Sequence, residues 1–323
     1  MKQYHDLLLK LLNKRDLHGL RDNRTDTPTT ALFCEAMRWD LSEGFPLITT
    51  KKVNFRAVAH ELLWFLSGDT NIRYLLENDI HIWTEWPHKR FNEMFDENMD
   101  IKEFEKRIVA NDYTEVKRLG KSQTVRFGDL FGDLGPVYGH QWRRFGEHDV
   151  GAGDEHSNGE YDEYKPGFDQ ITWVQNEIKT KPHSRRLIVS SWNPNDVGKS
   201  ALPPCHNYFQ FFVDNGKLSL MWNQRSADFF VGIPFNIASY ALLCHMMAKA
   251  CGLEVGELVW HGVDVHLYEN HVDMALEQLS RQEYPLPTLK INGEFDSVLD
   301  IKFDDIELIG YQHHPFIKAP VAV

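Results

Sequence analysis

The run from Ile237 to Cys251, IASYALLCHMMAKAC, is apolar on nearly all sides and constrains the fold more than any other segment. A helix without a polar face must be buried, so this run predicts a helix in the protein interior. Gly252 predicts the helix end, because glycine readily adopts the left-handed conformation found there. Earlier in the chain, two alternating apolar runs, 207–213 and 217–222, flank Asp-Asn-Gly and predict a β-hairpin.

The remaining segments mix helical and extended patterns. Helical periodicity predicts helices over 3–13, 55–66, 71–77, 171–179 and 272–281. Other apolar runs predict strands over 31–41, 186–192 and 257–268. Two segments, 87–128 and 146–166, are highly charged or rich in glycine, and we expect both to be surface insertions. We find no linker between independent domains, so we predict one α/β (α+β) domain over residues 1–323.

Composition disfavours several classes of protein. The chain of 323 residues has a formal net charge of −12, which argues against uniform attraction to nucleic acid or to an anionic membrane. No segment approaches ~18 consecutive apolar residues, so no membrane span is predicted. The cysteines form no C-x-x-C pair and are too sparse for a disulfide framework. The N-terminal residues lack the apolar core of a signal peptide, and we expect a reducing, cytoplasmic location.

Cys205 is the candidate nucleophile. It follows Pro203-Pro204 and precedes His206, while Arg225 and Ser226 lie just beyond the hairpin. Because the thiolate is the reactive form and a nearby cation favours it, these neighbours are typical of a catalytic cysteine. The alternative is a buried structural cysteine, which is the commoner fate of a lone cysteine.

Four arginines, Arg24, Arg185, Arg186 and Arg225, lie in or beside polar turns. If they converge, they form a phosphate clamp, because guanidinium groups match phosphate oxygens in a bidentate manner. If they do not, each is a solvated surface charge.

Glu61 interrupts an otherwise apolar helix, where a carboxylate either joins a polar network or transfers protons. Trp83 and Trp86 either stack on a flat ligand or pack in the core.

No metal site is predicted, because His266 and His271 are five residues apart and no acid completes a known ligand set.

Long motifs along the chain resemble the thymidylate synthase family. They include PPCHNYFQF, QRSADFFVGIPFNIASYALLCH, HLYENH, HELLWFLSGDTNI, GDLGPVYGHQWR, SRRLIVSSWNP and the closing IKAPVAV. The resemblance covers nearly the whole chain apart from the two expected insertions. It implies a large mixed sheet with flanking helices and a homodimer formed through one sheet face. It also implies methylation of dUMP at C5, with 5,10-methylenetetrahydrofolate as carbon donor and reductant.

For the chemistry on dUMP, the resemblance implies that Cys205 attacks C6 of the pyrimidine. Glu61 and His206 then relay protons, Tyr138 helps to remove the C5 proton, and Asn236 reads the N3–O4 edge. Covalent addition is required because C5 of uracil is too weak a nucleophile, and the charge developing on O4 needs a positioned donor.

The resemblance also implies which residues bind the phosphate and the ribose of dUMP. Those holding the phosphate and the ribose within one subunit are Arg24, Arg225, Ser226, His266 and Tyr268. Arg185 and Arg186 are implied to reach the phosphate from the other subunit. Arg225 also favours the thiolate.

For the folate, the resemblance implies that Asp228 holds the pterin ring. The other residues implied to contact the folate are Lys51, Trp83, Trp86, Gly232, Phe235 and Val323. Closure of the C-terminal segment excludes water, which would otherwise intercept a reactive methylene intermediate.

The chain departs from the family pattern at Asp26, Pro28, Thr84, Asn223, Val263 and Val265. Smaller polar groups at Thr84 and Asn223 suggest an alternative of the same fold, a dUMP hydroxymethylase in which water replaces hydride. A second alternative is a binding module for nucleotides or RNA that has lost catalysis. It is disfavoured because the residues assigned a chemical role are all present, and because the chain is acidic.

Overall fold

The computed structural model describes residues 1–323 except 24, 26, 96–97, 119–120, 148–165 and 321–323. The described chain forms two compact units. The first comprises 1–62, 174–189 and 205–323, and the second comprises 63–173 and 190–204. Most of the segment 146–166 lies outside the described residues. The expectation that residues 1–323 act as a single catalytic domain stays a prediction.

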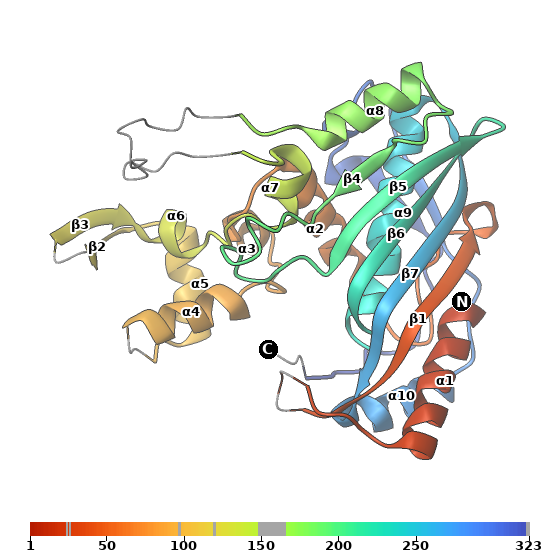
Figure 1. Ribbon diagram of the computed structural model, residues 1–323, viewed down its shortest axis with the longest axis horizontal. Helices are drawn as coiled ribbons and strands as arrows, with labels where there is room; N and C mark the ends of the chain where they lie inside the picture. Colours follow the sequence, from red (N-terminus) through yellow and green to blue (C-terminus); the bar gives the residue numbers. More distant parts are fainter. Residues whose placement is uncertain (24, 26, 96–97, 119–120, 148–165, 321–323) are drawn as a thin grey trace. The chain divides into compact units, whose positions relative to one another are not determined.

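A mixed five-stranded sheet is the centre of the first unit, with strand order β1-β7-β6-β5-β4 (Figure 1). The strands are β1 (Thr29–Asp40), β4 (Ile188–Ser190), β5 (His206–Asp214), β6 (Lys217–Asp228) and β7 (Glu254–Tyr268). Strand β7 pairs parallel to β6 and antiparallel to β1, and β5 pairs antiparallel to β6. This arrangement confirms the expected mixed sheet. Strand β4 is shorter than the predicted strand 186–192, because its neighbours on both sides leave the sheet.

The apolar run folds into helix α9 (Gly232–Cys251), which lies along one face of the sheet (Figure 1). Burial on nearly all sides confirms the prediction, and on this face the Trp222 ring of β6 stacks on Tyr240 of α9 at 4.8 Å. Gly252 ends the helix in the left-handed conformation, with φ of 68°. The helix begins earlier than predicted, because Pro234 falls in the first turn, where proline is tolerated.

The predicted hairpin joins β5 to β6. Asn215 and Gly216 have φ of 48° and 74°, the left-handed pair that a tight turn between twisted strands requires. Strand β6 runs past the predicted end at Trp222 as far as Asp228. Its extra length places the sequence Gln-Arg-Ser-Ala-Asp on a strand rather than in a loop, and this positions most of the candidate site.

Helices flank the sheet, as expected. Helix α1 (Lys2–His18) packs on β1 and on α10 (Val272–Leu279). The remaining elements that lie in this unit, wholly or in part, are α2 (Phe55–Ser67), α8 (Gln170–Thr180), β8 (Thr288–Ile291) and β9 (Ile306–Ile309). Within the described residues, no helix is long and apolar enough to cross a membrane.

The sheet face opposite α9 carries side chains that remain partly or fully exposed. The pairing register aligns Tyr208 with Asn223 and His261, and it aligns Gln210 with Met221 and Val259. Each of these six side chains is half-buried or exposed. Phe212 of β5 is 65% exposed.

The second unit has an aromatic core of its own. Its elements are α3 (Arg73–Glu77), α4 (Glu85–Phe95), α5 (Ile101–Ala110), β2 (Tyr113–Arg118), β3 (Lys121–Arg126), α6 (Phe127–Phe131) and α7 (Tyr138–Arg143). Phe91, Phe104, Phe127 and Phe131 are buried, and their ring centroids lie between 4.8 and 5.7 Å apart in the pairs that touch. The hairpin β2–β3 was not predicted, because its strands are mostly polar and lack alternation.

Candidate active site

Cys205 lies directly before β5, opposite Arg225 of β6. The Arg225 backbone N–H donates to the Cys205 carbonyl and to Asn207 Oδ1, both at 2.9 Å. A register shift between His206 and Tyr208 makes this possible, because it leaves Asn207 out of the strand pairing. Arg225 Nη2 lies 3.8 Å from Cys205 Sγ. The structure therefore places a guanidinium group beside the half-buried thiol, as the nucleophile hypothesis requires.

His206 lies on the inner side of β5 and is only 8% exposed. Burial lowers its pKa to about 4, although a hydrogen bond with Asn236 opposes this effect. The imidazole is therefore neutral near pH 7, with one nitrogen able to donate and the other able to accept. Its ring packs edge-on against Tyr240 of α9, with 5.4 Å between centroids.

Gln224 organises this region, and sequence reasoning missed it. Its amide nitrogen donates to Asn236 Oδ1 at 3.1 Å and to the Ser226 carbonyl at 3.0 Å. Its amide oxygen accepts from the indoles of Trp222 and Trp260 at 3.4 and 3.3 Å. A polar residue that alternates inward on a strand is the signal that would have revealed it. The bond to Asn236 fixes how that amide presents its donor and acceptor.

Asp228 ends β6 just before α9 begins. Its Oδ1 accepts from the backbone N–H groups of Phe230 and Val231 at 3.1 and 3.0 Å. The carboxylate side chain keeps 22% of its surface exposed. Gly232 follows on the first turn of α9, where an added Cβ would lie 3.7 Å from the Asp228 Cβ. Phe235 lies on the same helix and is half-buried.

Lys51 is buried, with 6% of its surface exposed. Its Nζ donates to the Phe230 carbonyl at 2.5 Å and lies 3.4 Å from the centroid of the Phe230 ring. Burial lowers the pKa of Lys51 to about 7, and the nearby Asp228 carboxylate opposes this effect. The ammonium group therefore faces the loop that carries Asp228 rather than solvent.

His266 and Tyr268 occupy the end of β7, next to the end of β6. His266 Nδ1 donates to Asp264 Oδ1 at 3.1 Å, and Arg21 bonds both oxygens of the same carboxylate at 2.6 Å. The bond from His266, together with Arg21, holds the pKa of Asp264 at about 2 despite partial burial. Nδ1 donates in this bond, which in the neutral ring leaves Nε2 of His266 as the acceptor. Sequence reasoning missed both Asp264 and Arg21.

Several predicted residues lie elsewhere in the first unit or outside the described chain. Glu61 is half-buried on α2, and Ser226 is half-buried on β6. Arg185 and Arg186 are exposed in the turn before β4, and within the described residues neither makes an ion pair. Arg24 and Val323 fall among the residues that the structure does not describe.

The second unit gathers the predicted aromatic residues. The Trp83 ring lies 5.4 Å from Trp86 and 6.3 Å from Tyr138, measured between centroids. Trp83 and Tyr138 are both buried. Thr84, the departure in this motif, is also buried, and its hydroxyl donates to Glu105 Oε1 at 2.7 Å. Helix α5 thus supplies a carboxylate beside Thr84.

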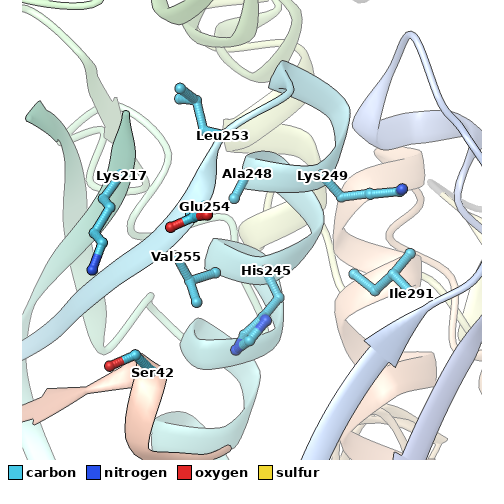
Figure 2. Close-up of a pocket in the computed structure, with 9 residues that line it drawn as sticks. All are labelled: Ser42, Lys217, His245, Ala248, Lys249, Leu253, Glu254, Val255 and Ile291. Carbon is cyan, nitrogen blue, oxygen red and sulfur yellow. The ribbon is translucent and has the colours of Figure 1, made fainter. Parts of the chain in front are cut away.

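A surface hollow of about 360 Å³ lies in the first unit at the C-terminal end of α9 (Figure 2). Its walls include Lys217, His245, Lys249 and Glu254. No residue predicted to act on dUMP or folate lines it. The hollow is therefore separate from the candidate site.

Comparison with known proteins identifies similar chains along the whole length. The family model described as Thymidylate synthase matches residues 2–323. A thymidylate synthase of Staphylococcus haemolyticus (strain JCSC1435) is 46% identical over 331 residues, covering 99% of this chain and 98% of the relative. One of Mycoplasma pneumoniae (strain ATCC 29342 / M129 / Subtype 1) is 46% identical over 325 residues, covering 100% of both chains.

The contact between Arg225 and Cys205 predicts the reactivity of the thiol. Replacing Arg225 by alanine removes the cation beside Sγ, so we expect alkylation of Cys205 by iodoacetamide at pH 7 to slow by about tenfold. Mass spectrometry of the modified peptide over time gives the rate. Arg38→Ala, which removes a positive charge that pairs with Glu257 on the same unit, is the matched control. An unchanged rate in Arg225→Ala would contradict the activating role.

The buried, neutral His206 predicts a pH dependence of stability. Its folded-state pKa of about 4 lies below the ordinary histidine pKa of 6.5, so the unfolded chain binds the extra proton first as pH falls. The free energy of unfolding should therefore decrease between pH 6.5 and 4, by up to about 1.4 kcal/mol per pH unit from this group. His206→Gln should flatten that part of the profile in urea titrations, whereas His183→Gln, at an exposed position, should not. An equally steep profile in His206→Gln would refute the assignment.

Proposed function

The chain belongs to the thymidylate synthase family, and from this premise we propose that it converts dUMP to dTMP through a covalent adduct on Cys205. The reaction is a reductive methylation in which 5,10-methylenetetrahydrofolate becomes dihydrofolate. The observation that carries the assignment of Cys205 is the 3.8 Å approach of Arg225 Nη2 to its sulfur. A thiolate stabilised in this way is the nucleophile that activation of the pyrimidine needs.

Addition of the thiolate to C6 forms a carbon–sulfur bond and moves an electron pair toward C5 and O4. The amide of Asn236, oriented by Gln224, is suited to pair with N3–H and O4. His206, neutral and hydrogen-bonded to Asn236, is suited to relay a proton toward O4 together with Glu61. These groups stabilise the negative charge as it develops, which is the larger part of the catalytic effect we assign to them.

The nucleophilic C5 then bonds to the one-carbon unit of the co-substrate. Loss of the C5 proton, which we assign to a path that includes Tyr138, breaks the bond to the folate and leaves a methylene group on C5. Transfer of a hydride from the folate reduces that group to methyl and oxidises the folate to dihydrofolate. Expulsion of Cys205 from C6 releases dTMP and regenerates the thiolate.

The reduced folate is a co-substrate whose ring carries N–H donors. Asp228 fits that chemistry, because its carboxylate is held by two backbone N–H groups and is still partly exposed. We propose that Gly232 and Phe235 pack beside it and that Trp83 and Trp86 supply stacking surfaces. Lys51 and Val323 are proposed to contact the folate at its glutamate end and over its ring. The covalent route assigns no step to a metal ion.

The phosphate of dUMP is proposed to bind Arg24, Arg225 and Ser226, while His266 and Tyr268 bind the ribose. The Nε2 acceptor of His266, left available by the Nδ1 bond to Asp264, suits a ribose hydroxyl donor. We propose that Arg185 and Arg186 of a second copy complete the phosphate site. Their exposure in one chain, and the exposed sheet face around Phe212, support a homodimer formed through that face.

The similarity to proteins named thymidylate synthase favours the synthase over the dUMP hydroxymethylase. Asn223, whose small side chain prompted the alternative, aligns with Tyr208 and His261 on the sheet face opposite α9. A binding module without catalysis is disfavoured by the contact of Arg225 with the thiol. We propose the reducing cytoplasm as the location, because all four cysteines are free thiols.

An incubation with dUMP and 5,10-methylenetetrahydrofolate tests the reaction directly. We expect equal amounts of dTMP and dihydrofolate, measured by chromatography. Formation of tetrahydrofolate with 5-hydroxymethyl-dUMP would instead identify the hydroxymethylase. Cys205→Ser should lose at least about 10³-fold in kcat, because the hydroxyl is a much weaker nucleophile. Cys34→Ser, at an exposed cysteine of β1, is the matched control and should keep normal activity.

Mixing two inactive chains tests the shared phosphate site. Cys205→Ala and the double variant Arg185→Ala/Arg186→Ala should each have little activity alone. After joint unfolding and refolding, random pairing gives one intact site in each mixed dimer, so about a quarter of wild-type activity should return. If both arginines served the site of their own chain, the mixed dimer would contain no additional intact site. No recovery of activity would therefore contradict the proposed exchange.

A further inference from the structure

His271 is a fully buried histidine to which the reaction scheme assigns no role. It ends the short 3-10 turn Glu269–His271 and directly precedes α10. None of its surface is exposed. Its ring packs between Phe230, at 5.5 Å, and Tyr268, at 5.4 Å, measured between centroids. It therefore lies in the layer that connects the loop after β6 with the end of β7.

One ring nitrogen of His271 binds the C-terminal segment. Nε2 lies 2.7 Å from the carbonyl oxygen of Pro320. A carbonyl only accepts, so Nε2 must carry the proton and donate. The bond is made three positions beyond Ile317, the buried apolar residue of this segment. Pro320 is itself exposed, and the bond from the buried His271 ring therefore holds it in place.

Other bonds hold the segment further back. The His314 backbone N–H donates to the Thr49 carbonyl at 2.8 Å, and Arg281 donates to the Pro315 carbonyl at 2.8 Å. These contacts fix the path of the chain up to Pro315. Beyond that point, the Ile317 side chain is buried and the His271 bond holds Pro320.

The second ring nitrogen faces the carboxylate proposed to hold the pterin. Nδ1 of His271 lies 3.9 Å from Asp228 Oδ1, and within the described residues it has no hydrogen-bond partner. A carboxylate at this distance attracts any positive charge on the ring and repels a lone pair. The position of the imidazole is thus coupled to Asp228 on one side and to Pro320 on the other.

We propose that His271 is a positioning residue that ties the C-terminal segment to the Asp228 loop, so that folate bound at Asp228 and the segment ending at Pro320 are aligned together. The inference rests on the proposed function. It depends on one buried, directional hydrogen bond, from His271 Nε2 to the Pro320 carbonyl, whose loss leaves the Pro320 segment free to move. A mobile segment covers the folate less well and admits water to the methylene-bearing intermediate.

The consequence is a change in what the enzyme makes, not only in how fast it works. Water that reaches the methylene group adds to it, which leaves 5-hydroxymethyl-dUMP and unoxidised tetrahydrofolate. Hydride transfer gives dTMP and dihydrofolate instead. The ratio of the two nucleotide products therefore measures the alignment of the segment, and a defect in folding alone would not change it.

Two substitutions separate the two nitrogens. His271→Gln places an amide N–H near the position of Nε2 and can keep the bond to Pro320, whereas His271→Asn reaches only the position of Nδ1 and loses that bond. We expect His271→Asn to raise KM for 5,10-methylenetetrahydrofolate by about tenfold, as loss of one buried hydrogen bond implies, and to form measurable 5-hydroxymethyl-dUMP. The value of KM for dUMP should stay within about threefold of wild type.

His271→Gln should remain close to wild type in both KM values and in its products. His245→Asn, a substitution of a half-buried histidine that lines the hollow in Figure 2, controls for loss of an imidazole elsewhere in the first unit and should give only dTMP. Should the Asn variant fail to fold in a thermal unfolding experiment, His271→Leu removes the same donor with an apolar side chain. Chromatography of the nucleotide products gives the ratio for every variant.

Wild-type KM and only dTMP from His271→Asn, or from His271→Leu where that variant replaces it, would overturn the inference. Equal impairment of the Gln variant and the donor-less variant would also overturn it, because ring packing rather than the bond to Pro320 would then be responsible. Failure of the wild-type protein to make dTMP is a different result, since it would refute the proposed function itself.

Discussion

The buried amide of Gln224 is the interaction on which the rest of the site depends. It joins β6 to β7 through Trp260 and to α9 through Asn236, and it does so with both donor and acceptor satisfied. A buried amide left without partners would cost a large part of the net stability of a domain, so the arrangement around Gln224 is strongly determined. Because Gln224 immediately precedes Arg225, the same constraint fixes the strand position from which the guanidinium group approaches Cys205.

The charged groups of the site lie close to an apolar interior. Helix α9 provides that interior along the sheet, and it brings Asn236 against His206 and places Gly232 next to Asp228. Burial keeps His206 neutral and lowers the pKa of Lys51 to about 7. A low-dielectric setting strengthens each hydrogen bond made to a charge that develops in the reaction. In the proposed mechanism, the core therefore contributes to catalysis as well as to stability.

Much of this arrangement could be predicted from the sequence. The apolar run predicted α9, its glycine end and its burial, and the Asp-Asn-Gly turn predicted the β5–β6 hairpin, in which the structure gives Asn215 and Gly216 left-handed conformations. Such features are local, because helix periodicity and turn geometry depend on neighbouring residues. The hairpin β2–β3 was missed because its own sequence carries no such local pattern. Its strands are polar, and Phe91 and Phe104, which come from helices elsewhere in the chain, pack with Phe127 directly after it.

The sequence by itself determined the kinds of side chain available for the chemistry, namely a thiol, several guanidinium groups, a carboxylate and an amide. It also carried the family resemblance through its long motifs. Only the tertiary structure decided which groups meet. Cys205 and Arg225 are twenty positions apart yet lie 3.8 Å from each other, and His271 contacts Pro320 across 49 positions. The roles of Gln224, Asp264 and His271 depend on strand register and burial. Those properties arise from contacts between distant segments, which no local pattern encodes.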